Sequence, residues 1–270
     1  MTHPPPLPSR VLALPGGPAR VVDVGEGPPI LCVHGLPGAA TDFRWLAAPL
    51  AGRARLVAVD LPGFGGTPVA TGPDPSPEGR AAFVLAVVDA LDLPPAVIVG
   101  HSMGGLVAVA AVASRPTAFR ALGLLASPGL RPHRLYRRLP RGLLDRAVNG
   151  PLGPVFLPFV RWMFTRAGFR GQPDGAIRRT LACLRATSLA AHGARVRGLE
   201  LPTLTAWCAD DPIVDPPVLA ELDGALPPGP RLRWDAGSHL PQRAHAAEVA
   251  AALSALAAPA PPTARPARGS

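Results

Sequence analysis

A serine framed by glycines, in the stretch GHSMGG at residues 100–105, constrains this chain more than any other feature. The stretch follows an apolar run typical of a buried strand, 96–99, and precedes a run of small and apolar residues typical of a helix, 106–113. A G-x-S-x-G pattern between a strand and a helix predicts a sharp, strained turn with the serine at its apex, flanked by residues that must be very small. Such a turn exposes the hydroxyl of Ser102 where the helix start points N–H groups at developing negative charge. The pattern therefore indicates a nucleophilic serine.

Two further motifs follow strand-like runs nearer the N-terminus. Residues 30–33 (ILCV) lead into HGLPG at 34–38 and then Trp45, and residues 56–59 (LVAV) lead into DLPGFG at 60–65. Together with GHSMGG, these motifs closely resemble the α/β-hydrolase superfamily, in its cap-bearing, esterase-like branch, over about residues 21–256, with the part after Gly129 matching least. The resemblance implies an α/β fold: a doubly wound, mostly parallel β-sheet with a helical cap inserted after the sixth strand.

The pattern of the remaining chain agrees with that fold. Strands are indicated at 11–14, 20–24, 30–33, 55–59, 96–99, 120–125, 203–207 and 232–234, with helical patterns at 43–50, 77–92 and 103–114. Near-continuous apolar strands alternating with helices predict a parallel sheet covered on both faces, with its site at the carboxyl ends of the strands. We expect disordered segments at 1–9 and 258–270, a core of 10–128 and 199–257, and a cap at 129–198.

The 129–198 segment differs from the rest of the chain in charge. It contains 14 arginines and two aspartates, a formal charge of +12, whereas the other residues, with 13 arginines and 16 acids, sum to −3. The chain has no lysine, so its overall isoelectric point says little about partners, and the segment contains no recognised nucleic-acid motif. We expect a small-molecule substrate and no nucleic-acid partner. Peripheral membrane contact through basic residues such as Arg137 and Arg138 stays open, and the sequence carries no signal for an oligomeric state.

Cysteine usage and hydropathy bear on location. Cys32, Cys183 and Cys208 are too few and too scattered for a disulfide framework, and no C-x-x-C motif occurs. The proline-rich start of the chain lacks the apolar core of a signal peptide, and no apolar run reaches the length of about 18 residues that a transmembrane helix needs. We therefore expect a cytoplasmic protein without a transmembrane segment.

A nucleophilic serine requires a base to take its proton and an acid to orient that base. In the family the acid follows a late strand in a W-G-x-x-D-x-x-V pattern, and the run WCADDPIV at 207–214 aligns Asp211 with it. Asp210 and Asp215 are the alternatives, and a turn-capping role for Asp211 is the other interpretation. Cys208 stands where the pattern has glycine, which leaves the geometry of this turn open.

The base is expected after the last strand. AGSHLP at 236–241 resembles the family's A-G-H-x-P turn, with Ser238 as an extra residue, and so predicts His239 as the base. His101 belongs to the serine turn, and His34 is expected to brace its own loop. The resemblance also implies an oxyanion hole made by the backbone N–H groups of Leu36 and Met103. We expect neither a metal nor a cofactor.

The middle of the predicted cap is rich in aromatic residues. The run VFLPFVRWMF at 155–164 predicts an apolar substrate pocket lined by Phe156, Phe159, Trp162 and Met163. With the serine, the acid and the base, such a pocket favours hydrolysis of a carboxylic ester with a medium-sized, apolar substrate.

Two alternative functions stay open at this point. One is hydrolysis of a carbon–carbon bond in a β-diketone-type acid, as in the meta-cleavage branch of the superfamily. That branch commonly has Asn before the serine and Trp after the histidine, where this chain has His101 and Leu240. The other is a non-catalytic ligand receptor or membrane-docking protein, against which the complete set of Ser102, Asp211 and His239 argues.

Overall fold

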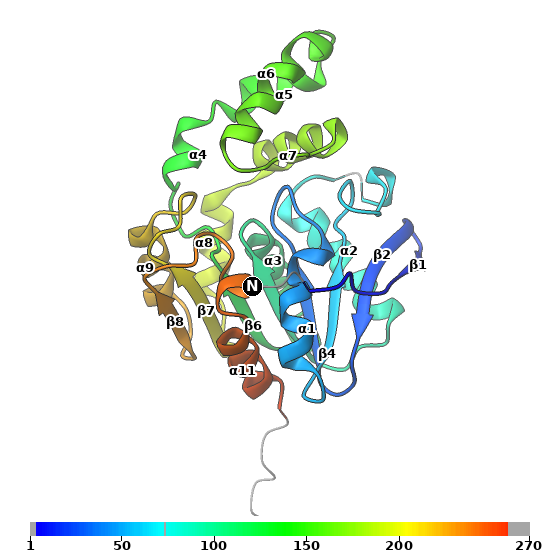
Figure 1. The fold of residues 1–270 in the computed structure, drawn as a ribbon, viewed down its shortest axis with the longest axis vertical. Helices are drawn as coiled ribbons and strands as arrows, with labels where there is room; N and C mark the ends of the chain where they lie inside the picture. Colours follow the sequence, from blue (N-terminus) through cyan, green and yellow to red (C-terminus); the bar gives the residue numbers. More distant parts are fainter. Residues whose placement is uncertain (1–3, 73, 259–270) are drawn as a thin grey trace, which may run out of the picture.

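A single eight-stranded sheet forms the centre of the computed structural model, which describes residues 4–72 and 74–258 (Figure 1). The strands are β1 (Ser9–Leu14), β2 (Gly17–Val24), β3 (Pro29–Val33), β4 (Arg55–Val59), β5 (Ala96–His101), β6 (Phe119–Leu125), β7 (Thr203–Cys208) and β8 (Arg231–Trp234). Their order across the sheet is β1-β2-β4-β3-β5-β6-β7-β8. The strands from β4 to β8 pair in parallel, while β1 and β2 form an antiparallel hairpin at one edge. The predicted mostly parallel, doubly wound sheet is confirmed.

Helices cover both faces of this sheet because successive residues of each central strand point to opposite sides. In β3, Leu31 and Val33 belong to a core cluster that includes α2 and α3, whereas Ile30 and Cys32 belong to a second cluster that includes α1 and α11. The core helices are α1 (Arg44–Leu50), α2 (Pro77–Ala90), α3 (Gly104–Ser114), α9 (Pro216–Ala225), α10 (Pro241–Ala244) and α11 (Ala246–Ala257), with short 3-10 turns at Ala40–Phe43, Val69–Thr71 and Pro116–Ala118.

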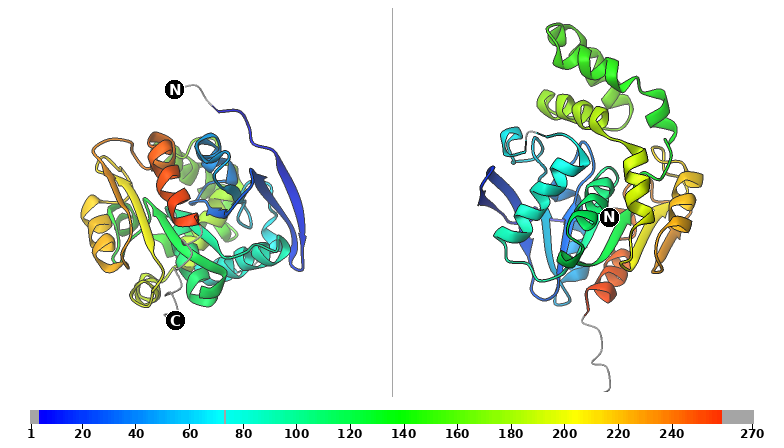
Figure 2. Two further views of the ribbon diagram at one scale, coloured as in Figure 1. Left: turned by 90° about the horizontal axis from the view of Figure 1, so that it is seen from below. Right: turned by 180° about the vertical axis from the view of Figure 1, so that it is seen from behind.

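A group of helices between β6 and β7 stands apart from the sheet (Figures 1 and 2). It consists of α4 (Arg134–Arg138), α5 (Arg141–Asn149), α6 (Gly153–Arg166) and α7 (Asp174–Ala186), and it has a small apolar core of its own that includes Leu157, Val160 and Ile177. Helices therefore follow the sixth strand, where the cap is predicted. The last helix of the insertion, α8 (Leu189–Arg197), instead packs against α3 and places Val196 in the main core.

The structure differs from the predicted disordered N-terminal segment, 1–9, at its last residue. Ser9 is ordered as the first residue of β1 and pairs with Val22 of β2. Residues 259–270, which make up most of the predicted C-terminal tail, lie outside the described residues, as do residues 1–3. In the part of the chain that the structure describes, no helix is long and apolar enough to cross a membrane.

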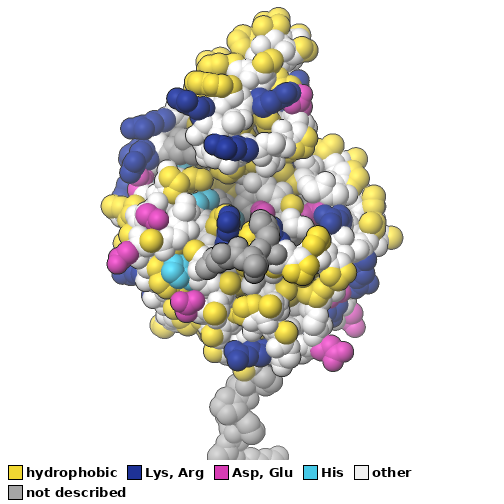
Figure 3. Space-filling view, in the orientation of Figure 1, with side chains coloured by type: hydrophobic (Ala, Val, Ile, Leu, Met, Phe, Trp, Pro, Cys, Tyr) yellow, Lys and Arg dark blue, Asp and Glu magenta, His cyan; other side chains and the backbone are white. Residues whose placement is uncertain are grey.

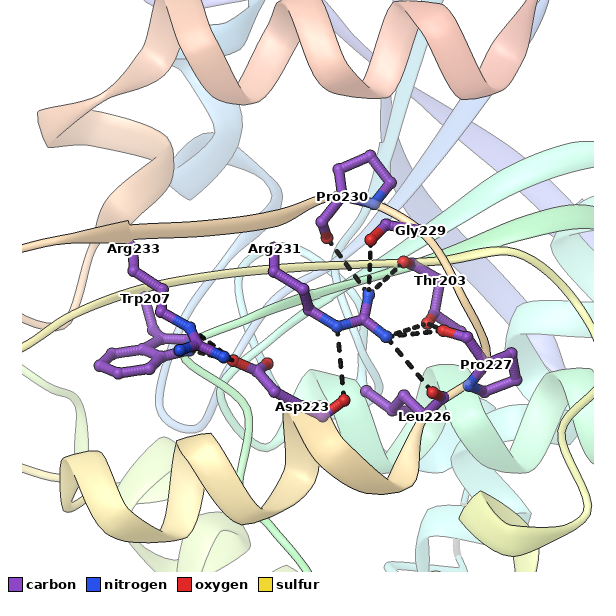
Figure 4. Close-up of polar contacts among 9 residues, drawn as sticks. All are labelled: Thr203, Trp207, Asp223, Leu226, Pro227, Gly229, Pro230, Arg231 and Arg233. Carbon is purple, nitrogen blue, oxygen red and sulfur yellow. Dashed lines mark hydrogen bonds and ion pairs between the residues drawn. The ribbon is translucent and has the colours of Figure 1, made fainter.

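A buried carboxylate holds the far edge of the sheet together (Figure 4). Asp223 of α9 accepts hydrogen bonds through Oδ2 from the indole Nε1 of Trp207 in β7, at 3.0 Å, and from Nε of Arg233 in β8, at 2.9 Å. Beside it, the guanidinium of Arg231 donates to the main-chain oxygens of Thr203 and Pro227, both at 2.6 Å. These bonds tie β7 and β8 to α9, so the turns that leave both strands start from fixed positions.

We expect Asp223→Ala to lower the free energy of unfolding by about 2–3 kcal/mol, because the substitution leaves the buried Trp207 indole N–H without an acceptor and removes an ionic partner of Arg233. Urea denaturation followed by circular dichroism measures the change. Asp235→Ala is the matched control, since Asp235 is exposed on the neighbouring turn, and its effect should stay within about 0.5 kcal/mol. Equal effects of the two substitutions would contradict the role given to Asp223.

Candidate active site

Ser102 occupies the sharp turn between β5 and α3. Its backbone is left-handed, with φ of +51°, which is rare and strained for a residue other than glycine. Two hydrogen bonds hold the turn: the N–H of Ser102 donates to the carbonyl oxygen of Leu125 in β6, and the N–H of Gly105 donates to the carbonyl oxygen of Ser102, both at 2.8 Å. The strained serine turn predicted from the sequence is therefore present, and its geometry is that of a nucleophile elbow.

Glycines are required around Ser102 because other backbone segments approach closely. A Cβ atom at Gly100 would lie 2.4 Å from Cα of Gly105, and one at Gly104 would lie 2.3 Å from the carbonyl oxygen of Val33. A Cβ atom at Gly35 would lie 2.9 Å from Cβ of Ser102. The loop after β3, the end of β5 and the start of α3 thus meet with no room for side chains.

His239 and Asp211 complete a hydrogen-bonded series with this serine. Nε2 of His239 lies 2.9 Å from Oγ of Ser102, and Nδ1 of His239 lies 2.7 Å from Oδ2 of Asp211. All three residues are buried. Since the carboxylate accepts a hydrogen bond from Nδ1–H, Nε2 of the neutral imidazole is left to accept the hydroxyl proton. The structure brings together the three residues that the sequence predicted as nucleophile, base and acid.

The aspartates on either side of this series have other partners. Asp210 accepts hydrogen bonds from the backbone N–H groups of Ser238, at 2.7 Å, and Gly237, at 3.2 Å. Asp215 accepts from the backbone N–H and Nε of Arg134 in α4, at 2.6 and 2.9 Å. Asp211 is therefore the only one of these three aspartates that faces the imidazole of His239.

The turn before His239 explains the extra serine in its motif. Ser238 has a left-handed backbone, with φ of +59°, and its N–H donates to Asp210, so the extra residue is accommodated in the turn. The sequence missed the role of Asp210, although two adjacent aspartates after a strand are the signal that could have indicated it.

The carboxylate of Asp211 is held in place as well. Its second oxygen, Oδ1, accepts hydrogen bonds from the N–H groups of Ile213 and Val214, at 2.8 and 3.1 Å.

His101 supports the base from the other side. Its Nε2 lies 2.8 Å from the carbonyl oxygen of His239 and so carries the proton that it donates. Burial lowers the pKa of His101 to about 3, which keeps the ring neutral. The sequence placed His101 in the serine turn but did not predict this contact with the backbone of His239.

His34 braces the loop that approaches Ser102, as predicted. The N–H of Leu61 donates to Nε2 of His34 at 2.9 Å, and Nδ1 lies 2.6 Å from the carbonyl oxygen of Gly35, to which it donates. Complete burial lowers the pKa of His34. Asp60 similarly holds the start of the DLPGFG loop, accepting from the N–H groups of Ala40 and Gly66 at 2.7 and 2.8 Å.

A cavity of about 190 Å³ opens between Ser102 and the helices above it. Leu36 and Met103 line it beside the serine, and neither of their N–H groups donates a hydrogen bond to another part of the described chain. The upper wall is mostly apolar and comes from α6, α7 and the loop between them, with Val160, Met163, Phe164, Ala167, Phe169, Leu181 and Leu184. Polar side chains on the wall belong to His133, Tyr136, Arg138 and Thr180.

The structure corrects the predicted pocket residues. Met163 lines the cavity, but Phe156, Phe159 and Trp162 lie outside it and are 41%, 55% and 56% exposed. The reason is the rotation of α6 about its axis. Leu157, Val160 and Phe164, spaced three and four residues apart, form the inward face, and the three aromatic residues lie on the side away from it.

No group of three or more His, Cys, Asp or Glu side chains is arranged to hold a metal ion within residues 4–72 and 74–258. The three cysteines are free and buried, as expected for Cys32 and Cys208.

Comparison with known proteins identifies the family. A profile of the "Alpha/beta hydrolase family" matches residues 30–252. The chain belongs to this family. The eight-stranded, mostly parallel sheet described above agrees with this family.

Individual relatives match to different extents. The chain is 32% identical over 259 residues to a pimeloyl-[acyl-carrier protein] methyl ester esterase of Stenotrophomonas maltophilia, covering 86% of this chain and 94% of that protein. It is 33% identical over 100 residues to an uncharacterized hydrolase of Bacillus subtilis, covering 37% of each. It is also 33% identical over 124 residues to a 2-hydroxy-6-oxo-2,4-heptadienoate hydrolase of Pseudomonas putida, covering 45% of each. The chain thus spans less than half of the last two relatives.

Solved structures agree with the fold. A thermophilic esterase from Thermogutta terrifontis superposes with a TM-score of 0.68 at 22% identity, covering 91% of this chain and 96% of that one. A meta-cleavage product hydrolase from Pseudomonas fluorescens superposes with a TM-score of 0.70 at 19% identity, covering 92% and 96%. At these identities the likeness establishes the fold alone.

We expect Gly104→Ala to lower the free energy of unfolding by about 1–3 kcal/mol, because the new methyl group would meet the carbonyl oxygens of Val33 and His34, which the sheet holds in place. Urea denaturation measures this change. Gly142→Ala is the matched control: it lies within α5, where a Cβ atom would meet nothing within 4 Å, and it should stabilise by about 0.5–1 kcal/mol. If the two substitutions change the free energy of unfolding equally, the serine turn does not need a glycine at position 104.

Proposed function

We propose that the protein hydrolyses carboxylic esters through an acyl-enzyme intermediate, with Ser102 as nucleophile, His239 as general base and Asp211 as the acid that orients the base. The observation that carries this proposal is the series of contacts from Ser102 Oγ to His239 Nε2, at 2.9 Å, and from His239 Nδ1 to Asp211 Oδ2, at 2.7 Å. These distances lie within the range at which a base takes a proton from a nucleophile.

In the first half of the reaction, Nε2 of His239 accepts the hydroxyl proton while Ser102 Oγ attacks the ester carbonyl carbon. The resulting tetrahedral oxyanion accepts hydrogen bonds from the backbone N–H groups of Leu36 and Met103. His239 then returns the proton to the leaving alcohol as the carbon–oxygen bond breaks. Asp211, close to Nδ1, stabilises the charged imidazolium that exists between these two transfers.

In the second half, water attacks the acyl-serine ester. His239 takes a proton from the water, the same oxyanion site holds the second tetrahedral intermediate, and the proton passes back to Ser102 Oγ as the carboxylic acid leaves. Removal of one backbone donor from such a site typically costs about 3 kcal/mol of transition-state stabilisation. Main-chain donors keep this contribution independent of the side chains at 36 and 103.

The cavity supports a medium-sized, apolar acyl or alkyl group. Its wall combines aliphatic and aromatic side chains with few polar groups, and two of these are engaged: Thr180 donates to the carbonyl oxygen of Ala176 at 2.7 Å, and Tyr136 donates to that of Thr187 at 3.3 Å. We further propose that residues 129–198 act as the cap that selects the substrate. The esterase of Stenotrophomonas maltophilia, whose name specifies a methyl ester, supports the ester assignment.

A second candidate, hydrolysis of a carbon–carbon bond in a β-diketone-type acid, is favoured by the partial match to the heptadienoate hydrolase of Pseudomonas putida. Arg138 on the cavity wall is the residue that could bind the carboxylate of such an acid. His101 and Leu240, where that branch commonly has Asn and Trp, count against it. Parallel assays on p-nitrophenyl esters and on a dienoic diketo acid separate the two, and faster turnover of the diketo acid would reverse the order proposed here.

We expect Ser102→Ala to lower ester turnover at least about a thousandfold, because the nucleophile, base and acid act as one unit. A fluorophosphonate probe, followed by mass mapping, should label Ser102 in the unsubstituted protein and label nothing in the variant. Ser127→Ala is the matched control, since Ser127 is a buried serine near the same turn; it should keep both labelling and turnover. Labelling at another residue, or residual turnover in Ser102→Ala, would overturn the assignment.

The cavity wall yields a second test on two adjacent residues. Met163→Trp should lower kcat/KM for p-nitrophenyl octanoate at least about tenfold relative to the acetate, because the larger ring fills the space for the acyl chain. Trp162→Ala should leave both values unchanged, since Trp162 lies outside the cavity. The opposite pattern would show that the acyl chain binds on the other face of α6.

A further inference from the structure

The outer face of the cap exposes an unusual amount of apolar surface. Six large apolar side chains of α5, α6 and the turn between them are between 41% and 71% exposed: Leu143, Leu152, Val155, Phe156, Phe159 and Trp162. We call this set the outer cap face. Hydrophobic side chains gather at this end of the molecule in the space-filling view (Figure 3). Only two other large apolar side chains in the described chain are so exposed, Val11 and Val69 on the core.

Helix α6 carries two apolar stripes with the same spacing. Leu157, Val160 and Phe164 form the inner stripe and pack in the cap core. The outer stripe consists of Val155, Phe159 and Trp162 with Leu152, the residue directly before α6, again three and four residues apart. At 3.6 residues per turn the two stripes lie on roughly opposite faces of the helix. A surface helix needs only the inner stripe for folding, so the outer stripe calls for another explanation.

The aromatic residues of the outer stripe are arranged together with a cation. The rings of Phe159 and Trp162 are stacked, with centroids 5.9 Å apart and an angle of 22° between their planes. The guanidinium carbon of Arg166, one turn further along, lies 5.4 Å from the centroid of the Trp162 ring. The face therefore combines an apolar platform with a positive charge at its edge.

The charge around this face is almost entirely positive. Of the two aspartates in the cap, Asp145 is buried and paired with Arg185, and Asp174 is paired with Arg161. Arg146, Arg166 and Arg170 are exposed, and the described part of the chain offers none of them an ion pair. A partner of the outer cap face must therefore accept apolar side chains at its centre and present negative charge around them.

We propose that the outer cap face docks on an anionic lipid surface, with Phe159 and Trp162 in the boundary between headgroups and acyl chains and with the exposed arginines against anionic headgroups. Helices that lie in a membrane interface have this composition: Trp, Phe and Leu on one face, basic residues flanking them, and little acidic charge. The place in the fold agrees, because α5 and α6 lie at the end of the molecule opposite α11 (Figures 1 and 2) and can meet a flat surface first.

Other occupants fit these observations less well. Two copies joined about a twofold axis through this face would bring like arginines toward one another. An acidic protein would match the charge, but a single projecting helical stripe offers no groove for its side chains. A bilayer requires no complementary shape. This proposal does not depend on the chemistry proposed for Ser102, because none of the six residues of the outer cap face lines the cavity.

The test is co-sedimentation of the full chain with phosphatidylcholine vesicles that contain or lack phosphatidylglycerol. We expect binding to the anionic vesicles that weakens with added salt. Phe159→Ser combined with Trp162→Ser should lower the partition coefficient at least about tenfold. The matched control, Val11→Ser combined with Val69→Ser, removes two exposed apolar side chains from the core and should bind as the unsubstituted protein does. Both double variants should keep turnover of a soluble short ester, which shows that they fold.

The charge is tested separately. Arg166→Gln combined with Arg170→Gln should lower binding to the anionic vesicles about twenty-five-fold, at about fivefold for each arginine near the surface. The matched control is Arg53→Gln combined with Arg197→Gln, which removes two exposed arginines from the core and α8. This control should leave vesicle binding unchanged. Failure of the unsubstituted protein to bind, or binding that survives the serine substitutions, would overturn the proposal. Analytical ultracentrifugation provides a further check. If the unsubstituted protein is a dimer and the two serine substitutions dissociate it, the outer cap face binds a second copy and the proposal is wrong.

Discussion

The left-handed backbone at Ser102 is the constraint on which the rest of the site depends. Such a conformation is unfavourable for serine, and it persists because Leu125 of β6 accepts the N–H of Ser102 and because neighbouring backbone packs closely around Gly100 and Gly104. These contacts come from the central strands and the start of α3. The hydroxyl is therefore held by the sheet itself, and the turns that follow β7 and β8 need only bring Asp211 and His239 to a fixed point.

Much of the fold and of the site could be predicted from the sequence because their signals are local. The central strands β3 and β5 are buried on both faces, so they are near-continuous apolar runs that end directly at HGLPG and GHSMGG. The glycines of the serine turn are visible because backbone crowding excludes every other residue there. Asp211 was harder to single out, since Asp210 beside it is the same residue type. Only the direction of the chain after β7 decides that one faces His239 and the other faces the backbone at 237–238.

The orientation of α6 could not be predicted for a physical reason. Its two apolar stripes have the same spacing of three and four residues, so the periodicity gives no preference for either as the inner face. The larger aromatic side chains suggested a pocket at Phe156, Phe159 and Trp162, yet smaller residues, Leu157 and Val160, fill the space against Ile177 and Leu181 in α7. Packing against α7 made the choice, and the sequence of α6 alone does not contain that information.

The hydrogen bond from His101 to the carbonyl oxygen of His239 has a wider consequence. The residue beside the proposed nucleophile also holds the main chain of the proposed base, so one direct contact adds to the positioning that the strands provide. Both residues of this contact belong to the core, outside the α4–α7 helices. The α4–α7 helices have an apolar core of their own, so a change within that core leaves the contact between His101 and His239 in place. Under the function proposed above, the substrate is then selected by one part of the chain and the reacting groups are aligned by another.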